Sequence, residues 1–399
     1  MKFRRRRCTI IVLVLGALCA HAQEEQPWWY LMERGKLYFR QGDYGSALLS
    51  FEDARRQRYN RYTGMEKDLI NFLSIPEVRA IGDSLDLVDD YARERNYVDV
   101  EKALDELYYR FPRENLGNSA LRALEELGTF KDYPEADYWI GEVYRVEGEL
   151  GLALGQYQKA LALSACFEDP DFELDLLYRM ADLYRARQNF SLMEETLLKI
   201  VEGSNTLGQV WDPLWSGSSG EFTRNSMSRT LANSGPARFL VMYRYNNGPV
   251  ERAHRLLGFY YYAFNRYNRA AEHLMFAFLI QNSVLIEEVR RDRYDFVFES
   301  LENLADSLGR RTDLLEYMNS SEYYRCTYYL GNSLYGIGRE TSARTLWGFL
   351  GGRERIGEWR GLALAQLERP SVENAVGGSA VGNSATGNSA VGGSAAGGP

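Results

Sequence analysis

The stretch GKLYFRQGDYGSALLSFEDA, residues 35–54, decides the fold of this chain. Small and aromatic side chains alternate along two segments that are separated at Gln41-Gly42-Asp43, and within each segment the apolar positions recur at spacings of three, four and seven. Such spacings place side chains on one face of a helix. Two antiparallel helices approach closely where facing residues are small, so we expect Gly35 to meet an alanine of the second helix, with aromatic rings filling the space beside the crossing.

This pattern returns three more times in the sequence. The further copies are Gly141, Tyr144, Gly148, Ala153, Tyr157 and Ala160; Gly258, Tyr261, Tyr267, Ala270, Leu274 and Ala277; and Leu330, Gly331, Gly338, Ala343 and Trp347. A single helix pair buries one face and leaves another uncovered, so the pairs are expected to stack on each other. The sequence therefore predicts an all-α protein.

The spacing resembles the tetratricopeptide repeat, a helix-turn-helix of about 34 residues. The best matches are 28–61, 134–167, 251–284 and 324–357, and weaker ones lie around Tyr91 and around Ala181. The resemblance implies a right-handed α-solenoid. Because the matches lie further apart than one repeat length, extra helices are expected between them, at Met65–Leu73, Ser119–Leu127, Ala237–Tyr245 and Leu285–Leu308.

The first 22 residues have the composition of a secretory signal peptide. Five basic residues precede a short apolar run at Ile10–Leu18, and Ala20-His21-Ala22 is a small-residue cleavage site. We expect cleavage after Ala22 and a soluble, periplasmic chain without a transmembrane span, since no later apolar run approaches the roughly 20 residues that a spanning helix needs. The alternative is a lipoprotein anchored through Cys19.

Charge divides the remaining chain into two halves. Residues 23–202 carry 36 acidic and 22 basic side chains, whereas 236–370 carry 16 acidic side chains and 18 arginines. The whole chain has a net charge of −8, and no basic surface of the kind that binds nucleic acid is expected. After the signal peptide at 1–22, this division predicts an acidic helical array at 23–202 and a second helical array at 236–370.

Two segments lack the helical pattern. Residues 203–235 are rich in Ser, Asn, Thr and Gly and are predicted to be a linker or large loop, whose Trp211 and Trp215 are expected to dock on the helices rather than grip a partner. Residues 371–399 are predicted to be disordered, because their Ala/Gly/Ser-rich pentapeptides, from Ala375 to Pro399, contain no charged or aromatic side chain.

No catalytic, cofactor-binding or metal-binding set of residues is recognisable. The chain after the signal peptide retains two cysteines, Cys166 and Cys326, and two histidines, His254 and His273, without the close spacing of a zinc site. The favoured function is a non-catalytic scaffold that binds other proteins, such as components of the envelope or of wall synthesis. The alternatives are a cell-wall enzyme resembling lytic transglycosylases, and a lipid-anchored component of outer-membrane assembly.

The resemblance also implies where a partner binds. In the repeat family the first helix of each pair lines the concave surface, and the corresponding positions in the second half are rich in arginine and tyrosine, as interface hot spots are. These candidate partner-binding residues are Arg252, Arg255, Phe259, Tyr262, Arg325, Tyr328, Asn332 and Tyr335, followed on the same faces by Ala263 and Gly336. The ligand expected there is an acidic and aromatic segment. The alternative is that the tyrosines pack between helices and the arginines are solvated.

Overall fold

The protein is helical throughout its described part. The computed structural model describes residues 26–73, 102, 127–169, 171–205, 208–216, 219–309 and 311–372. Within these ranges the only β-structure is an isolated bridge between Ser204 and Val210. The predicted all-helical class is therefore confirmed for the described residues. The predicted signal peptide, Cys19 and the predicted tail beyond residue 372 lie outside them.

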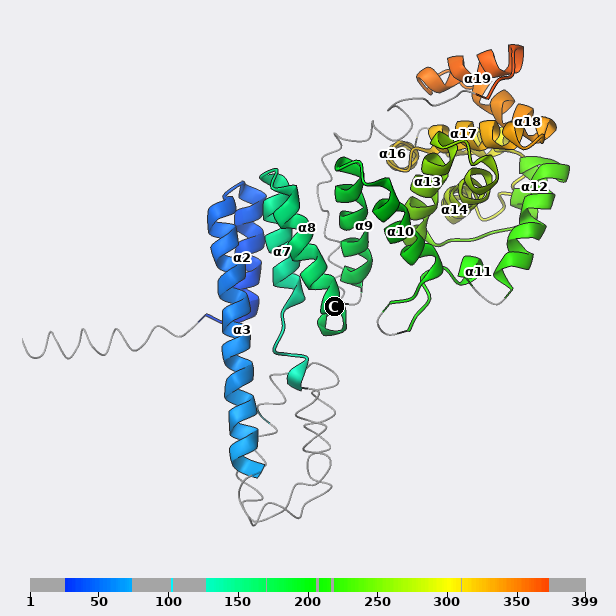
Figure 1. Cartoon of the computed structure of the whole chain (residues 1–399). Helices are drawn as coiled ribbons and strands as arrows, with labels where there is room; N and C mark the ends of the chain where they lie inside the picture. The colour runs from blue at the N-terminus through cyan, green and yellow to red at the C-terminus, as the bar shows by residue number, and fades with distance from the viewer. Residues whose placement is uncertain are drawn as a thin grey trace, which may run out of the picture. The chain divides into compact units, whose positions relative to one another are not determined.

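The chain divides into two compact units, Met1–Leu176 and Leu177–Pro399. In the first unit the helices α2 and α3 pack along each other, and so do α7 and α8 (Figure 1). A core formed by residues of α2, α3 and α7 includes Leu31, Phe51 and Ile140. The bounds of these helices are Trp28–Gln41 for α2, Tyr44–Leu73 for α3, Pro134–Val146 for α7 and Leu150–Ala162 for α8.

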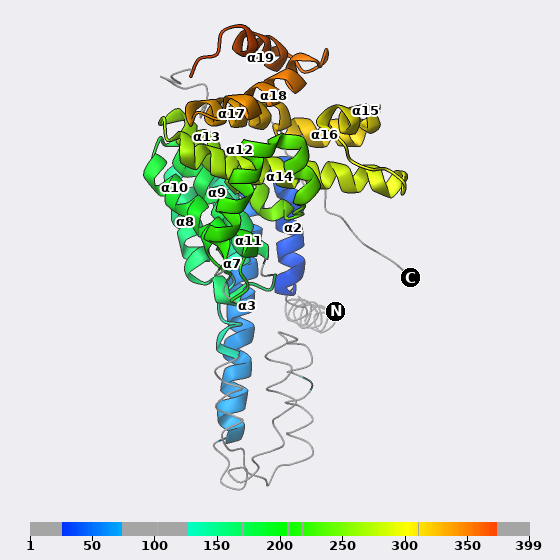
Figure 2. The same ribbon diagram turned by 90° about the vertical axis from the view of Figure 1, so that its right-hand side faces the viewer.

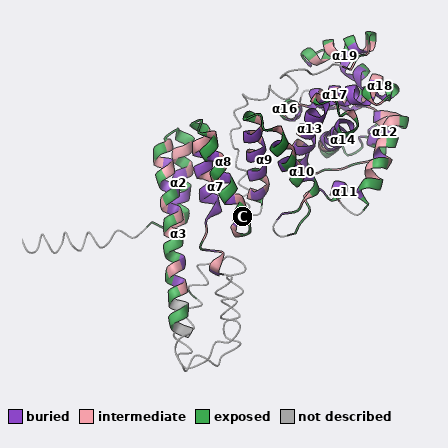
Figure 3. Ribbon diagram, in the orientation of Figure 1, coloured by how far each residue is buried: buried purple, intermediate pink, exposed green. Residues whose placement is uncertain are grey.

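The second unit surrounds one long buried helix, α14, which packs against α12, α13, α15 and α17 (Figure 2). Its side chains are buried on every face along most of its length (Figure 3). The helices of this unit are the end of α9 (Asp171–Ala186), α10 (Phe190–Glu202), α11 (Pro213–Ser216), α12 (Gly220–Met242), α13 (Gly248–Ala263), α14 (Tyr267–Asp292), α15 (Leu301–Leu308), α16 (Thr312–Ser320), α17 (Tyr323–Gly336), α18 (Glu340–Gly351) and α19 (Glu358–Glu368).

Five helix pairs share one local arrangement. Each has a small residue in the first helix, a residue with left-handed backbone seven positions later, and a buried bulky residue sixteen positions later. The small residues are Gly35, Gly141, Ala181, Gly258 and Gly331; the turn residues, with φ between 58° and 86°, are Gly42, Gly148, Gln188, Asn265 and Gly338; the bulky residues are Phe51, Tyr157, Leu197, Leu274 and Trp347.

The glycine and the bulky residue form the closest contact of the crossing. A Cβ added to Gly35 would lie 2.5 Å from the Phe51 ring, and one added to Gly331 would lie 2.7 Å from the Trp347 indole nitrogen. The prediction that glycine meets an alanine holds at Gly141, where an added Cβ would lie 3.3 Å from Ala153 O, but at all four glycines the nearest neighbour is the bulky residue. The missing side chain of glycine instead leaves room for a large side chain of the second helix, which fills the crossing at the density of a protein interior.

The turns of the five pairs are also alike. In each, an amide N–H just beyond the left-handed residue donates to a carbonyl in the last turn of the first helix over 2.8–3.0 Å, as in the bond from Arg266 N to Tyr261 O. This is the hydrogen bond of a Schellman motif, which satisfies carbonyls that a helix end otherwise leaves unpaired. The turn closes the same way with glycine, glutamine or asparagine in the left-handed position.

The prediction of a linker at 203–235 is wrong for most of that segment. Pro213–Ser216 form α11 and the residues from Gly220 onward form the first part of α12, which left-handed backbone at Gly235 divides just before Pro236. Met227 and Leu231, spaced one helical turn apart, are buried, and Leu231 O accepts a hydrogen bond from Ser342 of α18. Tertiary packing thus stabilises a helix whose Ser, Asn and Thr content disfavours it locally.

The predicted boundaries and extra helices are also corrected. The two units separate within α9, between Leu176 and Leu177, and not at 203–235. The predicted helix at Met65–Leu73 is the end of the continuous α3, and Leu285–Leu308 contains the end of α14 and all of α15. Ser119–Leu127 lies almost entirely outside the described residues.

Candidate functional site

The candidate residues on α13 are mostly used within the second unit. Arg252 Nη2 forms an ion pair with Asp182 Oδ2 at 2.6 Å, and its side chain is 39% exposed. Arg255 is buried and pairs with Glu251 at 3.0 Å and with Glu322. Ion pairs of this kind neutralise arginines that would otherwise be costly to bury. Only Arg252 on this helix face remains accessible to a partner among the predicted arginines.

The aromatic candidates on α13 pack against α17. Phe259 is 3% exposed and lies edge-on to Tyr329, and Tyr262 is fully buried against the same ring, with centroids 4.7 Å apart. Arg325 stacks its guanidinium 4.4 Å from the Phe259 ring centroid and pairs with Glu322 at 2.5 Å. These contacts join the two helix faces that the resemblance implied to be open.

The remaining candidates on α17 form a buried polar cluster. Asn332 accepts a hydrogen bond from Trp347 Nε1 at 3.0 Å and donates one to Tyr262 OH at 3.2 Å. Tyr328 is fully buried and accepts a hydrogen bond from Gln366 at 3.4 Å. Tyr335 is half-buried beside Trp347, with ring centroids 5.7 Å apart.

Burial corrects the expectation that these eight side chains line an open groove. Six of them are buried, and they serve packing within the unit: Arg255, Phe259, Tyr262, Arg325, Tyr328 and Asn332. The alternative that the tyrosines pack between helices describes Tyr262 and Tyr328, whereas Arg255 and Arg325 are paired rather than solvated. The reason is that α13 and α17 contact each other directly. Arg252 and Tyr335 are the candidates left at the surface.

An open pocket lies at the turn end of the same helices. It has a volume of about 390 Å³ and is bordered by the α13–α14 turn and by the C-terminal end of α17, including Gly336 from the predicted face. A Cβ on Gly336 would lie 2.8 Å from the Tyr267 ring, so the close approach of these elements requires glycine. The seven lining residues are Asn265, Arg266, Tyr267, Asn268, Arg269, Gly336 and Ile337. We call this the turn pocket.

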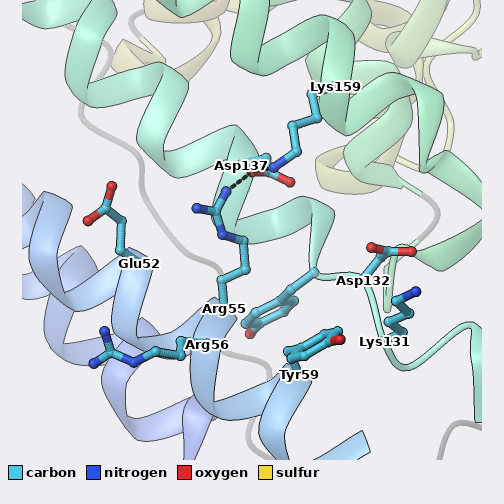
Figure 4. Close-up of a pocket in the computed structure, with 9 residues that line it drawn as sticks. Glu52, Arg55, Arg56, Tyr59, Lys131, Asp132, Asp137 and Lys159 are labelled. Atoms are coloured by element: carbon cyan, nitrogen blue, oxygen red, sulfur yellow. Dashed lines mark hydrogen bonds and ion pairs between the residues drawn. The ribbon is translucent and has the colours of Figure 1, made fainter. Parts of the chain in front are cut away.

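A second pocket, of about 460 Å³, lies in the first unit (Figure 4). Arg55 and Lys159 both reach the buried carboxylate of Asp137, each at 2.6 Å from the same oxygen, and so join α3 and α8 to α7. Arg56 pairs with Asp53 at 2.5 Å. The charged lining residues are Glu52, Arg55, Arg56, Lys131, Asp132, Asp137 and Lys159, so once Arg56 is paired with Asp53, three cations face three carboxylates. Charge in this pocket is balanced.

Sequence reasoning missed a fully buried polar network in the second unit. His254 Nε2 lies 2.7 Å from Asp212 Oδ2, and His254 Nδ1 lies 3.0 Å from His273 Nδ1. One of the two Nδ1 atoms must carry the shared proton while the other accepts it. The Trp215 ring stacks on His273 with centroids 4.4 Å apart, so this tryptophan docks on the helices as predicted. The sequence contained an indication that these histidines meet. His254 lies one helical turn before Gly258, His273 directly precedes Leu274, and Gly258 contacts Leu274 where α13 and α14 cross.

The network makes the second unit sensitive to pH. Burial lowers the pKa of the His273 imidazole well below its usual value of 6.5. Charge on His254, Arg269 and Arg224 acts in the same direction. Below about pH 6.5 the unfolded chain therefore binds a proton at this imidazole that the folded unit does not bind. This contribution to stability is complete above about pH 6.5 and is lost as the pH falls toward the folded-state pKa.

We therefore predict that His273→Asn flattens the acid limb of the stability profile. Asparagine retains a polar group near the position of Nδ1 but does not titrate. Below about pH 6.5 the free energy of unfolding of the wild-type chain should fall more steeply than that of the variant, by up to about 1.4 kcal/mol per pH unit. Urea titrations of both proteins from neutral pH to about pH 5.5 measure this difference. Parallel profiles would contradict it.

None of the described helices combines the length and the apolar composition that spanning a membrane requires. The fold and the sites thus define an all-helical protein with surface pockets and buried polar clusters.

No family model matches the sequence. The chain is similar to an uncharacterized protein of Treponema pallidum (strain Nichols), with 24% identity over 326 residues, which cover 81% of this chain and 84% of that protein. Because 326 residues exceed the length of either unit, the similarity includes residues of both.

Proposed function

We propose that this protein is a non-catalytic scaffold that binds other proteins, with tetratricopeptide-like helix pairs arranged as a right-handed α-solenoid with extra helices. The observation that carries the proposal is the fivefold recurrence of the crossing and turn described above. Repeated helix pairs leave surfaces between neighbouring units, and helical-repeat proteins commonly use such extended surfaces for binding. The proposal requires no metal or cofactor.

The composition of the first 22 residues favours export, so the proposed location is the periplasm or cell envelope, and the partners are envelope proteins. Anchoring through Cys19 remains the alternative location. Within the second unit, Arg252 and Tyr335 are the predicted residues that a partner reaches without displacing a helix. Arginine and tyrosine are the residue types that most often dominate binding energy.

The test is cross-linked affinity capture from the envelope with the full-length chain, followed by mass spectrometry and a binding titration with the captured protein. Arg252→Ala combined with Tyr335→Ala should weaken that binding about tenfold, which corresponds to about 1.4 kcal/mol. Arg291→Ala is the matched control, since Arg291 is exposed on α14 and pairs only with Glu288 in the described structure. Circular dichroism verifies that all variants remain helical.

Two results would overturn the scaffold proposal. One is that wild-type chain enriches no protein over a tag-only control. The other is that the purified chain degrades cell-wall material in a zymogram, which favours the alternative of a wall enzyme. Unchanged binding by the double variant would instead leave the scaffold in place and remove Arg252 and Tyr335 from its binding surface.

A further inference from the structure

The turn pocket differs from the pocket of the first unit in its charge. None of its seven described lining residues is acidic, and two of them, Arg266 and Arg269, are arginines. Their side chains are 54% and 60% exposed. The first-unit pocket around Asp137 has balanced charge, whereas the lining of the turn pocket has an excess of positive charge. Positive charge in a concave surface attracts anions most effectively.

The nearest carboxylate neutralises these arginines only in part. Both guanidinium groups lie 3.8 Å from the same oxygen of Glu194, at the outer limit of an ion pair. Glu194 is already engaged, because Tyr260 OH donates to it at 2.9 Å and Tyr261 OH at 2.7 Å. Two cations thus share one carboxylate that also accepts hydrogen bonds from two hydroxyl groups. Arg269 Nη1 donates in addition to Tyr261 OH at 3.4 Å. Because a guanidinium group carries five N–H donors, donors of both arginines remain for a ligand.

The backbone at the pocket adds to this positive charge without being the basis of the site. Arg266 is the N-cap of α14, a helix of 26 residues, and its side chain makes no capping hydrogen bond. The first amide groups of a helix have no partner within the helix and carry a partial positive charge. Asn268, at the second position of α14, brings a neutral amide donor to the same pocket.

We propose that the turn pocket binds adjacent carboxylates of an acidic polypeptide segment. This inference rests on the proposed function and assigns the charge of the partner at one site. Guanidinium groups match carboxylates in shape and hydrogen-bonding geometry, and the open, polar pocket suits side chains presented by an extended chain. The site lies on the helix turn and not on the first-helix faces, where Arg255 and Arg325 are already paired within the unit.

The experiment uses a fluorescein-labelled oligoglutamate peptide and measures its anisotropy with the full-length chain at low ionic strength. We expect saturable binding that weakens as salt is added. Arg266→Gln with Arg269→Gln should lower the affinity about tenfold or more. Arg290→Gln with Arg291→Gln is the matched control: it removes the same charge from the other end of α14 and should leave the affinity within about twofold.

The assignment is overturned by absence of oligoglutamate binding, by equal loss in both double variants, or by equal retention in both. A labelled oligolysine peptide should not bind at this pocket. Inorganic phosphate tests the other source of the same oxyanion chemistry. Displacement of oligoglutamate by millimolar phosphate, but not by chloride of equal ionic strength, would assign the pocket to a small anion and overturn the polypeptide assignment.

The experiments distinguish failure of the proposed carboxylate binding by the turn pocket from failure of the proposed scaffold function. The peptide titration requires no natural partner, so it decides the pocket even if capture from the envelope enriches nothing. Conversely, a captured partner that binds wild-type chain and Arg266→Gln/Arg269→Gln equally well would leave the scaffold function standing while removing the turn pocket from its binding site.

Discussion

Replacing Asp212 by alanine will destabilise the second unit by about 2–5 kcal/mol, because groups that donate to a fully buried carboxylate lose their acceptor. Asp212 is fully buried and accepts hydrogen bonds from Tyr245 OH at 2.6 Å and from Trp215 N at 3.0 Å, in addition to its contact with His254. Alanine removes this acceptor from the fully buried His254 and from the half-buried Tyr245 hydroxyl, whereas Trp215 N keeps its bond to the backbone carbonyl of residue 212 at 3.2 Å. Unsatisfied buried groups of this kind cost about 1–3 kcal/mol each.

Urea unfolding monitored by tryptophan fluorescence measures the effect, because the Trp215 ring lies against His254 and His273. Asp212→Asn, which retains one carbonyl acceptor, should lose less stability than the alanine variant. Asp306→Ala is the exposed control, and it should change the free energy of unfolding by no more than about 0.5 kcal/mol. A loss below about 1 kcal/mol for Asp212→Ala would show that the network does not hold α11 in place.

Replacing Gly258 by leucine will destabilise the same unit by about 1–3 kcal/mol or more through overpacking. A Cβ at this position would lie 2.5 Å from Leu274 Cγ and 3.2 Å from the backbone nitrogen of Leu274. A rotamer change moves the side chain but not that nitrogen, so the two helices have to separate. Gly141→Leu and Gly331→Leu should behave alike, because their added atoms would meet the Tyr157 ring and the Trp347 indole.

Thermal melts detect this change, since about 2 kcal/mol shifts the melting temperature of a unit of this size by roughly 4–8 °C. Gly361→Ala is the control: Gly361 is exposed within α19 and an added Cβ would meet nothing within 4 Å. That variant should be neutral or more stable by up to about 1 kcal/mol, because alanine favours helix more than glycine does. Neutral results at Gly141, Gly258 and Gly331 together would contradict the repeated crossing.

Most of the helix pairs follow from local sequence. The positions of Gly35, Gly141, Gly258 and Gly331 relative to the following bulky residues mark each crossing, and the helices α2, α7, α13 and α17 begin near the starts of the predicted units. The pair of α9 and α10 was harder to detect because Ala181 replaces glycine and Gln188 adopts the left-handed backbone without the usual glycine signal. For the pair of α9 and α10, the spacing between the small, turn and bulky positions is therefore more informative than the identity of the residues at them.

The candidate site was less accessible to sequence reasoning. Periodicity identifies which side chains share a helix face, as for Arg255, Phe259 and Tyr262, but an amphipathic face looks the same whether solvent, a partner or another helix covers it. Here α17 covers it. The turn pocket was missed for a related reason, because Arg266 and Arg269 join Gly336 only when two separate helix turns meet.

The sequence by itself determined the helical class and the places where helices pair, because these depend on residues within about twenty positions of one another. Only the tertiary structure decided which faces are buried, that residues 213–216 and 220–234 form helix rather than linker, and that Asp212, His254 and His273 meet in one network. Those outcomes depend on contacts between distant segments, where burial of a few apolar side chains such as Met227 and Leu231 outweighs local helix propensity.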